Sequence, residues 1–248
     1  MREIRTQQEL MAALIAFIAD KFPQNAVLKG GMSMKAAFNC KRHTADIDWT
    51  FIPFKSKKPV FGKLEKEIET LDYVRITGKG MHSTNGFIEV SLKSRPEIRT
   101  RIEFSAEEDC PAIPVSGTEF AASVDLPGFI LNVISPQVAM SNKLAAWLER
   151  DEMKDIYDIY YYAISGIVPD MVVLKKRLSK INYQRRTSLS KTLPFSEFLS
   201  LLLERVNGLS DKEMESLSPI LPANELPSLK QKIQSAISRM AFEIENKR

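Results

Sequence analysis

Apolar side chains recur along the chain with two different periods. A helical period follows a capping-box signal at Thr6 and Glu9 and predicts a first helix over about residues 7–21. Alternating apolar and polar positions, together with one short apolar run, then predict strands. These strands are expected at residues 26–28, 46–51, 73–77, 87–92 and 98–104, with a hairpin joining the last two. Helices are expected between them at residues 33–38 and 59–71.

Beyond about residue 136 only the helical period remains. Helices are expected at residues 137–148, 153–164, 168–178, 194–206 and 229–244. Strands followed by a run of helices are typical of an α+β protein. We therefore predict a mixed β-sheet domain with flanking helices over residues 1–124 and an all-helical domain over residues 125–248, with the boundary region at 122–136.

Composition mainly excludes classes of protein. The 248 residues are 44% hydrophobic and 27% charged, which is ordinary for a globular protein and excludes a disordered chain. Two cysteines and two histidines exclude a disulfide framework and argue against a structural zinc site. No apolar run reaches membrane-spanning length, and the apolar N-terminal stretch is amphipathic and unlike a signal peptide. The expectation is a cytoplasmic protein without membrane contact.

The formal net charge of +4 fits a polyanionic partner but does not single one out. One segment, Met171 to Lys191, contains seven basic residues and no acidic one. The basic residues are Lys175, Lys176, Arg177, Lys180, Arg185, Arg186 and Lys191. The segment could bind RNA phosphates with an affinity that falls steeply with salt. The alternative for each residue is a solvated helix face.

Candidate chemistry begins where the short strand at 26–28 ends. Gly30 and Gly31 allow the backbone to approach a ligand closely, and the following helix start presents free N–H groups to an anion. Ser33 adds a hydroxyl donor. Asp46 and Asp48 lie two apart on a strand, so both carboxylates point to one face. Adjacent carboxylates call for a cation, and Mg²⁺ binds carboxylates together with phosphate oxygens.

Glu103 fits the same chemistry. On the strand at 98–104 it shares a face with Arg99 and Arg101. If this strand lies beside the one at 46–51, Glu103 joins Asp46 and Asp48. Three carboxylates around two Mg²⁺ ions would serve in-line nucleotidyl transfer, with Glu103 as metal ligand or base. Each feature alone has a plainer explanation: a turn, a solvated strand end, or a surface glutamate paired with arginine. Their ordered combination favours function.

At these residues the chain resembles the DNA polymerase beta-like nucleotidyltransferase superfamily and, more narrowly, the AbiEii/AbiGii toxin family. The matching positions are Lys29, Gly30, Gly31, Ser33, Arg42, Thr44, Asp46, Ile47 and Asp48. Met32 stands where the family usually has a hydroxyl residue, and Ala45 replaces the usual glutamate. The resemblance implies a nucleotidyltransferase fold and an NTP bound by Lys29, Gly30, Gly31, Ser33 and Arg42.

A second block, Asn142 to Arg150 followed by Lys154 to Ile159, is similar to another motif of the family. The resemblance implies that Lys143 reaches the nucleotide phosphates, with Arg150 and Lys154 nearby. Asp155 and Asp158 would hold these cations in place or stand close to the metal. On one continuous helix the spacing places on a single face Lys143, Trp147, Arg150, Lys154 and Asp158. The alternative is a helix stabilised by surface ion pairs.

The expected activity is transfer of a nucleoside monophosphate from an NTP to a hydroxyl, with release of pyrophosphate. RNA, such as a tRNA 3′ end, is the favoured acceptor. The resemblance implies a toxin of a toxin–antitoxin or phage-defence system, with a cognate antitoxin as partner. Two alternatives stay open: transfer to a small-molecule or protein hydroxyl, and a non-catalytic member that binds a nucleotide or partner. Met32 favours the last alternative, and the three carboxylates argue against it.

Overall fold

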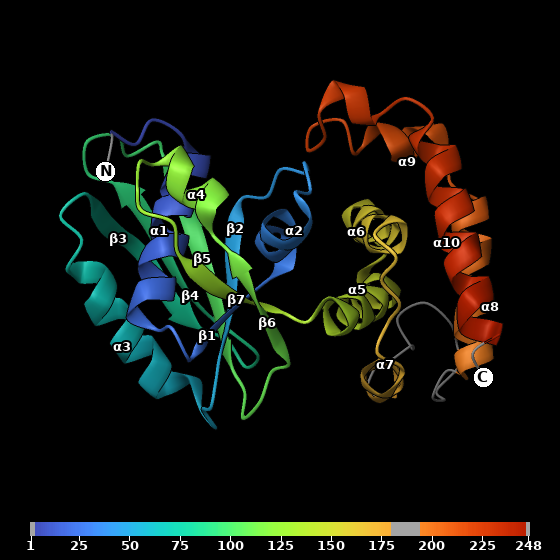
Figure 1. Cartoon of the computed structure of the whole chain (residues 1–248), viewed down its shortest axis with the longest axis horizontal. Coiled ribbons are helices and arrows are strands. Elements are labelled where there is room, and N and C mark those ends of the chain that lie inside the picture. Colours follow the sequence, from blue (N-terminus) through green and yellow to red (C-terminus); the bar gives the residue numbers. More distant parts are fainter. Residues whose placement is uncertain (1–2, 180–193, 247–248) are drawn as a thin grey trace. The chain divides into compact units, whose positions relative to one another are not determined.

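The computed structural model describes residues 3–179 and 194–246 (Figure 1). The chain divides into two compact units, Met1–Ile134 and Ser135–Arg248. The division after Ile134 lies within the region 122–136, ten residues after the boundary predicted between residues 124 and 125. The reason is that the last strand of the sheet, β7 (Ile130–Ile134), belongs to the first unit.

The first unit contains a seven-stranded sheet in the order β3-β4-β5-β2-β1-β7-β6. The other strands are β1 (Ala26–Lys29), β2 (Asp46–Phe51), β3 (Val74–Met81), β4 (Gly86–Leu92), β5 (Arg99–Ala106) and β6 (Ala112–Ser116). Strands β2 and β5 pair in parallel, as do β1 and β7, and the other neighbours are antiparallel. The predicted mixed sheet is therefore confirmed, including the β4–β5 hairpin.

One face of this sheet forms the hydrophobic core. Ile47, Trp49, Ile102 and Phe104 are fully buried there. Figure 1 shows α1 (Gln7–Lys21) and α3 (Lys57–Glu69) along the sheet, and α4 (Thr118–Ser123) packs on α1. Helix α1 begins with the predicted capping box. Because side chains alternate along a strand, the other face of β2 and β5 carries the polar residues.

Three elements of the first unit were not expected from the sequence: β6, α4 and β7. Strand β6 lies at the edge of the sheet, is largely exposed and contains Pro114, so its residues do not alternate between apolar and polar. Strand β7 is short, and its burial pattern does not follow a simple alternation. The period of the apolar residues therefore does not predict the strands in this part of the sheet.

The second unit is helical throughout its described residues. Its helices are α5 (Pro136–Arg150), α6 (Met153–Ile164), α7 (Met171–Leu178), α8 (Phe195–Asn207), α9 (Asp211–Glu215), the 3-10 turn η2 (Ala223–Glu225) and α10 (Leu229–Asn246). Helix α5 packs on α6 and α7, and α10 packs on α6 and α8. Among the described residues, no helix is both long and apolar enough to span a membrane.

Helices α5 and α6 are separate, as the predicted ranges 137–148 and 153–164 indicated, so the single helical face considered for Lys143 and Asp158 does not form. Asp151 ends α5 in the left-handed conformation, at φ 52°. The chain then turns back and α6 packs against α5. Residues of the second motif are consequently brought together across two helices and not along one face.

Candidate functional site

The parallel pairing of β2 with β5 places three predicted carboxylates on one face of the sheet. Asp48 lies opposite Glu103 in the register, and Asp46 lies opposite Arg101. Residues directly opposite each other on paired strands project to the same side. The condition for bringing Glu103 beside the two aspartates is therefore met. Asp46 is exposed, whereas Asp48 and Glu103 are half-buried.

The two glycines lie directly against side chains of this region. Gly30 has φ +68°, and a Cβ atom on it would stand 2.1 Å from Oδ2 of Asp48. A Cβ atom on Gly31 would stand 2.8 Å from Nη2 of Arg42 and 3.1 Å from Thr44. Any side chain at either position would displace its neighbours, so both glycines are required by close approach. They are the first two residues of α2 (Gly30–Phe38), so the N-terminus of this helix lies beside the carboxylate of Asp48.

Ser33 and Met32 are both buried. The Ser33 hydroxyl donates a hydrogen bond of 2.8 Å to the Gly30 carbonyl oxygen. A phosphate contact from Ser33 would require this bond to break. The Met32 side chain belongs to the hydrophobic core of the first unit. The residue that replaces the family's usual hydroxyl therefore serves packing in this chain.

Lys29 lies on the same sheet face as the carboxylates. It is opposite Asp48 in the β1–β2 register. Its Nζ donates to Oγ of Ser105 at 2.9 Å, and that hydroxyl is 2.9 Å from Oγ1 of Thr50. Arg42 is buried against Gly31 and donates to the His43 carbonyl oxygen at 3.2 Å. Both predicted cations thus border the glycine turn.

Glu103 is held by two groups, Asn85 and Arg101, and only Arg101 was expected beside it from the sequence. Nδ2 of Asn85 donates to its Oε2 at 2.9 Å, and Nη1 of Arg101 is 3.8 Å from its Oε1. Arg101 is itself held by a hydrogen bond to Glu89 and lies 4.7 Å from the centre of the Phe87 ring. The bond to Glu89 is the main cause of the raised pKa of Arg101. No spacing in the sequence marks Asn85, because it lies just before β4 and reaches Glu103 only when β4 pairs with β5.

The donor set of this face fits Mg²⁺. Asp46, Asp48 and Glu103 offer carboxylate oxygens, the ligands that this ion prefers. The missing side chain at Gly30 allows the Asp48 carboxylate to lie directly against the backbone at the start of α2. Within residues 3–179 and 194–246, however, no three acidic, histidine or cysteine side chains already converge as ligands of one ion. The three carboxylates share a face of the sheet, but their oxygens do not converge on one coordination site.

The second motif forms a buried ion-pair cluster in the helical unit. Nζ of Lys143 is 3.2 Å from Oδ1 of Asp155 and 2.7 Å from Oδ2 of Asp158. Arg150 binds Asp155 with both Nε and Nη2, at 2.6 and 2.8 Å. Both aspartates are 0% exposed. Burial alone would raise the pKa of Asp155, but its bonds to Arg150 and Lys143 outweigh burial, and the pKa is lowered.

Lys154 does not join this cluster. Its Nζ pairs with Glu152 at 2.7 Å, and its side chain is 46% exposed. Trp147 is buried and packs on Phe198. The expectation that both residues share a functional face with Lys143 followed from a continuous helix, which the turn at Asp151 excludes.

The predicted basic segment is only partly described. Lys175, Lys176 and Arg177 are exposed on α7. Lys180, Arg185, Arg186 and Lys191 lie outside the described residues.

Comparison with known families adds a decisive observation. The model of the nucleotidyl transferase AbiEii toxin family, of type IV toxin–antitoxin systems, matches residues 12–242. The chain belongs to the AbiEii family. It is accordingly a nucleotidyltransferase toxin of a type IV toxin–antitoxin system. Membership implies an NTP substrate, a divalent metal and an antitoxin partner. A search of curated protein sequences finds no match.

Two solved structures share the AbiEii-type fold with this chain. MenT4, a nucleotidyltransferase toxin from Mycobacterium tuberculosis H37Rv, is 14% identical, with a TM-score of 0.61 over 97% of this chain and 90% of that chain. JHP933 from Helicobacter pylori is 14% identical, with a TM-score of 0.52 over 97% of this chain and 93% of that chain. At such low identity the likeness concerns the fold alone.

The substitution Gly30→Ala tests the close approach to Asp48 in this AbiEii protein. The added methyl group would stand 2.1 Å from Oδ2 of Asp48 and must displace it. We expect nucleotidyl transfer to fall about 100-fold, as it does when a reacting group is misplaced by about an ångström. Gly62→Ala is the matched control, because nothing lies within 4 Å of its added methyl group. Equal transfer rates in the two variants would contradict the prediction.

The substitution Asp155→Asn tests the buried cluster. It leaves Lys143 and Arg150 without their shared charge partner, and we expect the free energy of unfolding to fall by about 3–5 kcal/mol. Glu152→Gln is the control, since its exposed ion pairs are worth about 0–1 kcal/mol. Urea titration followed by fluorescence of Trp147 in α5 measures the free energy of unfolding of both variants.

The stabilisation by Asp155 is also expected to depend on pH. Because the pKa of Asp155 is lowered, its stabilisation is complete above its ordinary pKa of 3.8. The difference from Asp155→Asn should therefore shrink as the pH falls below that value. A difference that does not depend on pH would contradict this explanation.

Proposed function

We propose that the protein is a Mg²⁺-dependent enzyme that transfers a nucleoside monophosphate from an NTP to a hydroxyl of RNA, with a tRNA 3′ end as the favoured acceptor. The observation that carries this proposal is the shared sheet face of Asp46, Asp48 and Glu103 beside the backbone of Gly30. Carboxylates next to a glycine turn and a helix start combine metal binding with a seat for phosphates.

In the proposed reaction the acceptor hydroxyl oxygen attacks the α-phosphorus of the NTP. A new oxygen–phosphorus bond forms, the bond to the bridging oxygen of the β-phosphate breaks, and pyrophosphate leaves. The hydroxyl proton passes to a carboxylate oxygen of Glu103, whose other oxygen is held by Asn85. Asp46 and Asp48 would hold Mg²⁺. When bound, the ion would neutralise phosphate charge and orient the triphosphate. Two such ions, as expected from the sequence, remain a prediction.

The triphosphate is proposed to lie at the start of α2. Gly30 and Gly31 leave no side chain between a ligand and the first N–H groups of this nine-residue helix, and its N-terminus carries partial positive charge. Lys29 and Arg42 add two cations at the same turn. This seat depends on backbone groups and fixed charges, and it does not require the buried Ser33 hydroxyl to reorient.

Lys143 is proposed to contact the phosphates as well. Its side chain is 16% exposed, and Asp155 and Asp158 hold its ammonium group in place. The two aspartates then act as positioning residues. Arg150 is 43% exposed and is proposed to supplement the charge of Lys143.

The RNA acceptor has weaker support. The net charge of +4 and the exposed cations of α7 favour a polyanion. A small-molecule or protein hydroxyl is the second candidate, and a cognate antitoxin is the proposed partner. Activity toward RNA would make the protein a toxin that modifies RNA. We propose that this modification serves phage defence.

Incubation of the protein with each α-³²P-labelled NTP, Mg²⁺ and total cell RNA tests the proposed reaction. We expect label in a tRNA-sized band, which the double variant Asp46→Ala/Asp48→Ala abolishes by removing the metal ligands. Asp20→Ala/Asp72→Ala is the matched control, because it removes two exposed aspartates of the same unit. Label only in protein or a small product would replace RNA as the acceptor. Transfer that survives loss of both Asp46 and Asp48 would overturn the assigned site.

Asn85→Ala tests the positioning of Glu103. Without the bond from Nδ2, Glu103 loses one of its two neighbours, and we expect the Mg²⁺ concentration for half-maximal transfer to rise about tenfold. Asn132→Ala removes an asparagine of the same sheet that bonds the Pro23 carbonyl oxygen, and it should leave this concentration unchanged. Identical Mg²⁺ dependence in both variants would show that Asn85 has only a structural role.

A further inference from the structure

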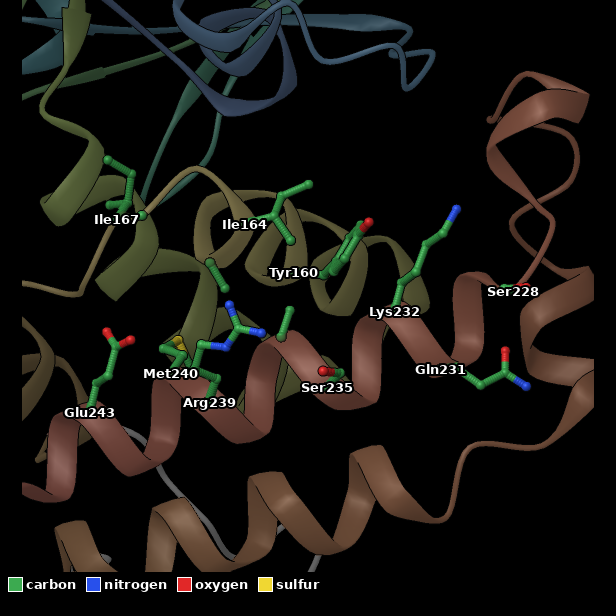
Figure 2. Close-up of a pocket in the computed structure, with 13 residues that line it drawn as sticks. Tyr160, Ile164, Ile167, Ser228, Gln231, Lys232, Ser235, Arg239, Met240 and Glu243 are labelled. Atoms are coloured by element: carbon green, nitrogen blue, oxygen red, sulfur yellow. The ribbon is translucent and has the colours of Figure 1, made fainter.

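An open groove with a volume of about 590 Å³ lies between helices α6 and α10 (Figure 2). Every residue that lines it belongs to the helical unit. The volume is within the range of about 300–1,000 Å³ that is typical of ligand sites. None of the residues assigned above to the transfer reaction lines this groove.

The two walls of the groove differ in chemistry. The wall from α6 and the turn after it is apolar, with Tyr160, Ile164 and Ile167. Ile164 is 54% exposed and offers apolar surface to a ligand. The wall from α10 is polar, and Figure 2 shows Lys232 and Arg239 extending from this helix on the side of the groove. A ligand that fits both walls has an apolar flat part and a charged edge.

The polar wall carries two cations, Lys232 and Arg239, and one carboxylate, Glu243. Within the described part of the chain, neither Lys232 nor Arg239 has a carboxylate at ion-pair distance. Of the nine other cations that the structure describes in the helical unit, five are paired: Lys143, Arg150, Lys154, Arg205 and Lys230. Glu243 lies at one end of the groove, beyond Arg239. An anionic ligand would therefore bind between Lys232 and Arg239, which are about 10.5 Å apart along the helix axis.

We propose that this α6–α10 groove binds single-stranded RNA. Phosphates would contact Lys232 and Arg239, and bases would pack on the exposed side chain of Ile164, beside Tyr160, which is itself 7% exposed. Ser235 lies on α10 between the two cations and offers a hydroxyl to a ribose 2′-OH. An acidic peptide would match the cations but would leave the apolar wall uncovered. This inference rests on the proposed function, since it gives the RNA acceptor a binding surface.

Binding of a fluorescein-labelled single-stranded RNA of about eight nucleotides tests the groove. The full chain carries Asp46→Ala/Asp48→Ala, and EDTA is present, so that binding is measured without transfer. Fluorescence anisotropy is recorded between about 50 and about 200 mM salt. We expect Lys232→Gln/Arg239→Gln to weaken binding and to reduce the slope of log K against log salt by about 1.4, since each lost phosphate contact contributes about 0.7.

Two variants serve as controls. Lys58→Gln/Lys66→Gln removes two exposed lysines of α3 and should keep the wild-type slope. Lys175→Gln/Lys176→Gln removes the same charge from α7. The groove is overturned if the α7 variant alone loses binding, if polyglutamate displaces the RNA at equal charge concentration, or if the parent protein does not bind the RNA.

The outcomes for the groove and for the proposed function are distinguishable. Loss of binding in Lys232→Gln/Arg239→Gln, together with no labelling of RNA by the wild-type enzyme, would retain the groove and reject RNA as the acceptor. RNA labelling that depends on Asp46 and Asp48 but is unchanged in the groove variant, with unchanged binding, would retain the function and reject the groove.

Discussion

The parallel register between β2 and β5 is the constraint on which the candidate site depends. It places Asp48 opposite Glu103, and the same alternation sends Ile47 and Ile102 into the core. A shift of one residue would turn the carboxylates into the core and the apolar side chains into solvent. Burial of the apolar face therefore fixes the position of the polar face. The free energy that folds the sheet also assembles the carboxylates.

Glycine packing adds the second half of the site. Strand β1 lies beside β2, and Gly30 turns the chain into α2 with its backbone against the Asp48 carboxylate. A helix N-terminus and the Asp48 carboxylate are thereby adjacent without any flexible side chain between them. Such preorganised dipoles and charges need little rearrangement when a triphosphate binds. Met32 can pack into the core because this seat is built from backbone groups.

The helical unit holds its charges in a different way. Lys143, Asp155 and Asp158 are brought together by the reversal at Asp151, and the two aspartates are fully buried. Buried ion pairs rarely increase stability over apolar packing, but loss of one partner is strongly destabilising. Their retention here is consistent with a fixed position for one lysine. Lys232 and Arg239, by contrast, face an open groove without carboxylate partners among the described residues, which is the arrangement expected of a surface that binds an anion.

Local pattern was enough to identify most elements and the chemistry of the first motif. The capping box at Thr6, the alternation through Asp46 and Asp48 and the glycine turn each depend on neighbours in the chain, so their residues predict them directly. Contacts between distant segments left no such signal. Asn85 reaches Glu103 through the pairing of two strands, and β6 and β7 complete the sheet as short strands. The reversal at Asp151 packs α6 against α5, which brings Lys143 to Asp155 and Asp158. These features arise because packing and register are set by residues far apart in the sequence, and they emerge only when the sheet and the helical unit are complete.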